Sequence, residues 1–149
     1  LTIKHLPPQL VPKKKLGATD IVACFICGTK LKLSMMRNHV GHHILFALYS
    51  LPDSKATKIE VGAEPCGWCG REGCYTQLKT SSKGINISFN CDYRYIKMSY
   101  KSAATSTAAT PCTNVPIHCV LCDKSTPGPR RTIWKYNAMF HLFSEHSPG

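Results

Sequence analysis

The chain has no long apolar run. None of its 149 residues belongs to an apolar stretch near the roughly 18 residues that a membrane-spanning helix needs. The opening segment, LTIKHLPPQLVPKKK, also lacks the apolar core of a signal peptide. These absences predict a protein without a membrane among its partners.

Acidic residues and catalytic motifs are also scarce. Only 8 residues are Asp or Glu, and no two of them form the close pair that general acid–base catalysis uses. The sequence has no Gly-rich phosphate loop and no nucleophile elbow. The sequence therefore predicts a protein that is not an enzyme.

Positive charge, by contrast, is abundant. Lys and Arg number 19, which gives a formal net charge of +11 and a pI near 9.4. This balance favours a polyanionic partner, although charge alone does not choose between nucleic acid and a membrane surface.

Cysteine and histidine are the residues that carry chemistry here. The nine Cys are an odd number, so a complete disulfide framework would leave one of them unpaired. Seven His accompany them, and zinc sites use both residue types whereas disulfide scaffolds need no His. The Cys and His fall into three groups along the chain.

The first group has the ligand order of a Cys2His2 zinc finger. Its candidate metal ligands are Cys24, Cys27, His39 and His43. Eleven residues separate the Cys pair from the first His and three separate the two His, so the His lie one helical turn apart. Gly28 suits the tight turn, and Leu31 and Met36 occupy the positions of a small apolar core. A redox pair of Cys and an exposed helix end with His are the alternatives.

The third group repeats this ligand order with a longer spacer. Its candidate ligands are Cys119, Cys122, His141 and His146. The loop DKSTPGPRR lengthens the spacer before a helix for which Thr132 is the expected N-cap. On that helix Trp134, Ala138, His141 and Glu145 would share one stripe, with the Trp in the core.

The middle group contains only Cys. The segment YTQLKTSSKGINISFNC predicts two strands around the turn SSKG, paired so that Leu78 faces Ile87 and Thr76 faces Phe89. That register brings together Cys74 and Cys91, which with the pair in PCGWCG form a four-cysteine zinc site, Cys66, Cys69, Cys74 and Cys91. A disulfide between Cys74 and Cys91 is the alternative.

Several Cys and His remain outside these groups. Cys112 is expected to be a buried apolar thiol, or else to replace Cys74 or Cys91 as a ligand. His5, His42 and His118 are spare.

The expected architecture is a small α+β protein stabilised by three Zn²⁺ ions. Two Cys2His2-type fingers flank the four-cysteine knuckle and hairpin. The expected divisions are a basic N-terminal segment (1–20), a zinc finger (21–50), a four-cysteine zinc-binding β-hairpin module (62–101), a linker (102–116) and a zinc finger with a long loop (117–149).

A family resemblance accompanies these patterns. The segments CFICG, RNHVGHHIL, PCGWCGREGC, PCTNVPIHCVLC and WKYNAMFHLFSEH, within residues 24 to 146, resemble a cysteine-rich, Cys2His2-like zinc-finger region of uncharacterised proteins from mushroom-forming fungi, some linked to mobile elements. The resemblance implies fungal origin and zinc, and no particular activity.

The favoured function is binding of nucleic acid, with double-stranded DNA in the nucleus as the expected partner. The base-reading positions of the first finger would be Lys32, Met35 and Asn38, and those of the last would be Trp134, Asn137 and Phe140. Because several of these cannot hydrogen-bond a base, phosphate contacts are expected to dominate affinity. The candidate contact residues are Lys30, Lys32, Arg37, Asn38, Arg130, Arg131 and Lys135. The alternative is a zinc-stabilised protein-interaction or assembly module.

Overall fold

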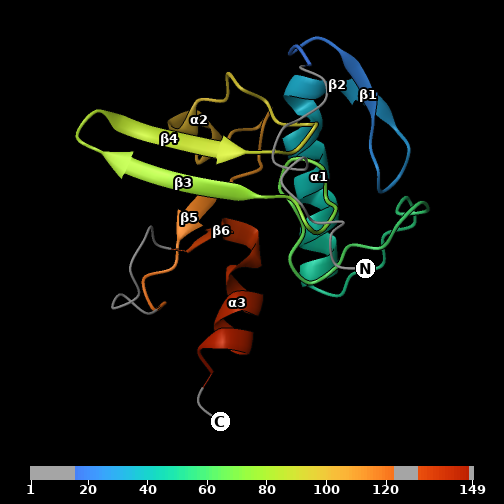
Figure 1. Ribbon diagram of the computed structural model, residues 1–149. Coiled ribbons are helices and arrows are strands. Elements are labelled where there is room, and N and C mark those ends of the chain that lie inside the picture. The colour runs from blue at the N-terminus through green and yellow to red at the C-terminus, as the bar shows by residue number, and fades with distance from the viewer. Residues whose placement is uncertain (1–15, 123–130, 148–149) are drawn as a thin grey trace, which may run out of the picture.

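A computed structural model of the chain describes residues 16–122 and 131–147 (Figure 1). This part of the chain is a small mixture of short strands and helices, as predicted. Most of the expected N-terminal segment and of the loop DKSTPGPRR lies outside the described residues. The elements are β1 (Ile21–Ala23), β2 (Lys30–Lys32), α1 (Leu33–Leu48), β3 (Thr76–Ser81), β4 (Gly84–Phe89), α2 (Tyr100–Ala103), β5 (Pro116–His118), β6 (Thr132–Trp134), the 3-10 turn η3 (Lys135–Asn137) and α3 (Ala138–Glu145).

The first part of the fold is an antiparallel hairpin followed directly by a helix. Val22 pairs with Leu31 across β1 and β2, and α1 begins at the residue after β2. Gly28 closes the turn between the strands at a φ of 81°, where a Cβ would be strained. Met36 is fully buried and Leu31 packs against its cluster, so the predicted small core is confirmed.

The β3–β4 hairpin has the predicted register. Leu78 pairs with Ile87, and Thr76 pairs with Phe89. In Figure 1 this hairpin extends to one side of α1. Leu78 is buried, but Ile85 near the tip is half exposed, because the tip extends beyond the elements that cover the base of the hairpin.

The third part differs from the prediction at its helix start. Thr132 is not an N-cap, because residues Thr132–Trp134 form a strand that pairs with β5. Its hydroxyl instead accepts a hydrogen bond from the backbone N–H of Leu78, at 2.8 Å. The α-helix begins only at Ala138. Trp134 is a core residue, as expected, but it lies on a strand and so does not share the helical stripe.

The PCGWCG loop packs against both the first and the third part of the fold. Trp68 is 1% exposed, and its ring meets that of Trp134 edge-on with centroids 5.5 Å apart. A Cβ at Gly67 would overlap Trp134, and a Cβ at Gly70 would overlap Ile26. The two glycines therefore allow the loop to approach both neighbours closely.

The end of the predicted linker packs against α1. Arg37 donates to the carbonyl of Asn114 at 2.7 Å, and the Asn38 side-chain oxygen accepts from the Cys112 N–H at 2.9 Å. A Cβ at Gly41 would lie only 2.6 Å from the sulfur of Cys112. Cys112 is thus a buried thiol at a helix interface. Within the described residues no helix has the length and apolarity needed to span a membrane.

Candidate metal centres

The structure brings the twelve predicted ligands together in three groups of four. Within each group the ligand atoms all lie within 4.8 Å of one another. The groups are Cys24, Cys27, His39 and His43; Cys66, Cys69, Cys74 and Cys91; and Cys119, Cys122, His141 and His146. Each group can hold one metal ion.

The spacing of the ligand atoms fits a tetrahedral ion of the size of zinc. Bonds of about 2.3 Å to sulfur and about 2.0–2.1 Å to nitrogen place ligand atoms about 3.8 Å apart for two sulfurs, about 3.6 Å for sulfur and nitrogen, and about 3.3 Å for two nitrogens. The sulfurs of Cys69 and Cys74 are 3.7 Å apart, and the Nε2 atoms of His39 and His43 are 3.3 Å apart. In the third group the distance from the Cys122 sulfur to Nε2 of His146 is 3.6 Å.

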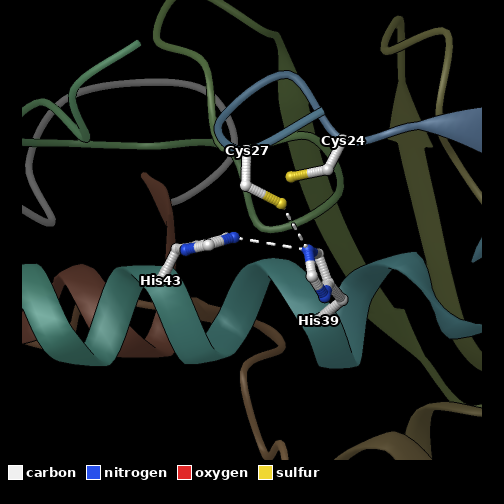
Figure 2. A group of neighbouring side chains, drawn as sticks. All are labelled: Cys24, Cys27, His39 and His43. Carbon is white, nitrogen blue, oxygen red and sulfur yellow. Dashed lines mark hydrogen bonds between the residues drawn. The ribbon is translucent and has the colours of Figure 1, made fainter. Parts of the chain in front are cut away.

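The first centre is formed by a turn and a helix. Figure 2 shows Cys24 and Cys27 on the turn between β1 and β2, facing His39 and His43 on α1. The Nε2 atoms of the two His point toward the sulfurs, and Nε2 of His39 lies 3.2 Å from the Cys27 sulfur. The Ile26 N–H donates to the Cys24 sulfur at 3.4 Å, which stabilises a thiolate.

A carboxylate orients one ligand of this centre. Nδ1 of His43 donates to Asp53 at 2.6 Å, so its Nε2 is left free to bind a metal. Carboxylates in this position fix the tautomer and ring orientation of metal-binding His. No spacing in the sequence points to Asp53, because the contact depends on the chain reversing after α1.

In the first centre the pKa shifts favour a cysteine thiolate beside a protonated histidine. Burial alone would raise the pKa of Cys24, but hydrogen bonds with His39 and His43 lower that pKa to about 5. The hydrogen bond with Cys24 raises the pKa of His43 to about 9, against the effect of burial. A metal ion bound to these groups would therefore find thiolate sulfur and would displace protons from imidazole.

The second centre unites the PCGWCG loop with both ends of the β3–β4 hairpin. Cys74 precedes β3 and Cys91 follows β4, so a metal held here closes the base of the hairpin. All nine cysteines are free thiols, and Cys112 is outside the three groups. Burial raises the pKa of Cys66, and four thiolates together require a cation to neutralise them. Arg71 supplies part of that charge by donating to the Cys69 sulfur at 3.4 Å.

The third centre resembles the first in its order of elements. Cys119 and Cys122 follow β5, His141 lies on α3, and His146 lies just beyond its end. The Nε2 atoms of the two His are 3.2 Å apart. Nδ1 of His141 is buried and has no hydrogen-bond partner among the described residues, so this centre lacks the carboxylate that orients His43.

The spare His take other roles. His118 donates to the carbonyl of Leu78 at 2.6 Å, which ties β5 to β3. His42 packs its ring on Phe46, with centroids 4.4 Å apart. His5 lies outside the described residues.

Two predicted nucleic-acid contacts have structural partners within the fold. Arg37 donates to the Cys112 sulfur and to the Asn114 carbonyl, and Asn38 accepts from the Cys112 N–H. Both side chains therefore hold residues 112–114 against α1. Sequence spacing on an isolated helix could not show this contact.

The remaining predicted nucleic-acid contacts differ in their exposure and in their partners. Lys30 and Lys32 are exposed on β2, whereas Arg131 lies within 4 Å of Glu64 and Glu145. Lys135 is exposed and donates to the hydroxyl of Thr113 at 3.3 Å. Arg130 lies outside the described residues.

The expected base-reading positions of the last helix are largely unavailable. Trp134 is in the core. Asn137 is buried, and its side-chain amide donates to the Pro65 carbonyl at 2.9 Å. Only Phe140 is exposed, and its ring cannot hydrogen-bond a base.

Replacing Asp53 with Asn tests the role of the carboxylate. We expect Asp53→Asn to weaken metal binding at the first centre by about 10- to 100-fold, since loss of such a partner leaves the His less basic and less well oriented. Competition with a chromogenic chelator would measure the metal affinity, and one of the three ions should be lost to the chelator more readily than in the unmodified chain. Asp20→Asn is the matched control, because the Asp20 carboxylate accepts from the Gly17 N–H and contacts no ligand. Equal affinities in the two variants would contradict the assigned role.

Family models, curated proteins and solved structures were each compared with the chain, and none of them matched. The resemblance to the fungal zinc-finger region therefore stays a prediction. The assignment of metal binding depends on the chain's own geometry: three groups of four Cys and His whose ligand atoms all lie within 4.8 Å of one another.

Proposed function

We propose that the chain is a zinc-stabilised, non-catalytic module that binds nucleic acid mainly through phosphate contacts. Cys and His ligands at tetrahedral spacing are typical of zinc, and each group supplies four protein ligands, which suits a structural site. In the first and third parts a hairpin is followed by a helix, which supports Cys2His2-type fingers there. The second is a four-cysteine site.

The observation that carries the proposal is the net positive charge of the chain, +11. From Gly73 to Cys122 the only acidic residue is Asp92, and the basic residues are Lys79, Lys83, Arg94, Lys97 and Lys101. Zinc bound to four thiolates contributes −2, and each Cys2His2 site is neutral, so the formal charge of the loaded chain is still about +9. A surface of this charge attracts phosphate.

Double-stranded DNA is the proposed partner, with little sequence selectivity. Lys30 and Lys32 present their charges on exposed β2, beside the start of α1. Because Asn38 is engaged within the fold and Met35 cannot donate a hydrogen bond, α1 contributes little base reading, and Lys32 on β2 is assigned to phosphate. Location in the nucleus and fungal origin belong to the same proposal.

Binding of a protein partner is the second candidate function. The third part exposes an apolar surface made by α3 and the turn after β5, which we call the α3 apolar surface. Phe143 is 68% exposed, and the other members are Val120, Leu121, Met139, Phe140 and Leu142. Exposed apolar residues in one small element are typical of interaction sites.

Replacing both β2 lysines tests the nucleic-acid proposal. We expect Lys30→Ala with Lys32→Ala to weaken binding to all duplex sequences by similar factors. Each lost phosphate contact should reduce the slope of log affinity against log salt by about 0.9. The Lys→Arg pair at these positions keeps the charge and is the matched control. An unchanged slope in the Ala variant, together with loss of a protein partner in Phe143→Ser, would instead support protein binding.

A further inference from the structure

A pocket of about 330 Å³ lies between the β3–β4 hairpin and the segment that follows it. Its lining combines aromatic residues with aliphatic side chains and one amide, that of Asn86. The aromatic residues are Trp68, Phe89, Tyr95 and Tyr100, and Ile85 and Ile96 also line it. The volume falls at the lower end of the range for small-molecule sites, about 300–1,000 Å³, and is suited to one planar ring system.

The aromatic walls are held in place by the surrounding fold. The hydroxyl of Tyr100 donates to the Pro116 carbonyl at 2.8 Å, and the rings of Trp68 and Phe89 lie with centroids 5.5 Å apart. Trp68 is almost fully buried, yet its indole N–H has no acceptor among the described residues. These contacts fix the positions of three of the aromatic side chains that line the pocket.

Two of the isoleucines that line the pocket are exposed. Ile85 is 50% exposed and Ile96 is 51% exposed. A second cavity of about 390 Å³ adjoins the first, because Tyr95 and Ile96 line both, and it extends to Lys97 and residues 16–18. Tyr95 and Ile96 therefore contact both cavities.

Basic residues alternate with the tyrosines in this segment. The sequence from Tyr93 to Lys101 reads YRYIKMSYK and contains no acidic residue. The guanidinium of Arg94 lies 5.8 Å from the ring centre of Phe89, and Lys97 borders the second cavity. Aromatic rings that stack bases, combined with cations that attract the backbone, are the features by which proteins bind single strands.

We infer that this pocket receives an unpaired base of single-stranded nucleic acid, with Tyr95 as the stacking partner and Arg94, Lys97 and Lys101 near the adjoining phosphates. The inference rests on the proposed nucleic-acid function and adds single strands to the duplex as a second class of nucleic acid that the chain binds. A base within a duplex is already stacked on both faces, so it cannot enter without leaving the helix. The second cavity beyond Tyr95 suits the neighbouring base.

The first experiment uses the unmodified, zinc-loaded chain. Its affinity for a short oligothymidylate is compared with that for an oligomer of equal length in which every base is replaced by tetrahydrofuran. The two probes carry the same phosphates, so phosphate contacts cannot distinguish them. We expect the oligothymidylate to bind about 5- to 100-fold more tightly, the range that stacking of one base supplies.

Substitutions at Tyr95 test whether the base binds in this pocket. Tyr95→Leu should abolish the preference for oligothymidylate, and Tyr95→Phe should restore it, because Phe retains the stacking surface. Tyr75→Leu is the matched control, since Tyr75 is an exposed tyrosine that does not line the pocket. A metal count and a circular dichroism spectrum for each variant would show that the fold is retained.

The outcomes separate this inference from the broader proposal. Equal affinity of the unmodified chain for the two oligomers would overturn the base pocket and leave phosphate binding intact. A preference that survives in Tyr95→Leu would place the base elsewhere and would also overturn it. Failure to bind duplex or single strand at any salt concentration would overturn the nucleic-acid function itself.

Discussion

Removal of zinc by a chelator is expected to unfold the whole chain rather than one part of it. Ligands are members of both apolar core clusters: Cys24 belongs to the first, and Cys66, Cys69 and Cys91 belong to the second. Without the ions, the negative charge of these thiolates is no longer neutralised, and the PCGWCG loop is no longer bound to the hairpin. A structural zinc contributes about 10–16 kcal/mol of binding free energy, whereas the net stability of a domain is about 5–15 kcal/mol.

Native mass spectrometry and circular dichroism would check this result together. The intact chain should carry three zinc ions, and the chelated chain should lose its cooperative thermal transition and regain it when zinc is returned. Cooperative unfolding of the metal-free chain would contradict the prediction. Two ions together with a Cys74–Cys91 disulfide would contradict the four-cysteine centre specifically.

Loss of a ligand from the second centre should have the next largest effect. In Cys91→Ser we expect one ion fewer and a loss of stability of about 4 kcal/mol or more, the range reached when a metal site is lost. Cys91 is buried beside the PCGWCG loop, and the Tyr93 N–H donates to its sulfur at 3.4 Å. Releasing it frees the end of β4 from the loop. The second core cluster would therefore loosen together with the hairpin.

Cys112→Ser is the matched control for this substitution. Cys112 is also a buried thiol, but its sulfur accepts from Arg37 at 3.1 Å and is not among the ligand groups. A serine hydroxyl can accept the same hydrogen bond, so three ions should remain and the loss of stability should be about 1 kcal/mol. Equilibrium denaturation with a metal count measures both variants. Loss of an ion from Cys112→Ser would show that Cys112 replaces another ligand.

Much of the candidate site could be predicted because its geometry is local. Cys24 and Cys27 are close in sequence, and His39 and His43 lie one turn apart on a helix, so spacing alone brings each pair together. The same holds for the hairpin, where the pairing of Leu78 with Ile87 implies that Cys74 and Cys91 meet at its base. The sequence by itself thus determined the three ligand groups and the register of the central hairpin.

Only the tertiary structure decided what surrounds these groups. Thr132 lies in a strand rather than at a helix start because β5 and β3 offer backbone partners to its segment. Arg37 and Asn38 are engaged because residues 112–114, distant in sequence, pack against α1. Asp53 reaches His43 through a chain reversal that no spacing encodes. In each case the partner belongs to a different segment, and a hydrogen bond to it depends on how the segments pack, which local patterns do not specify.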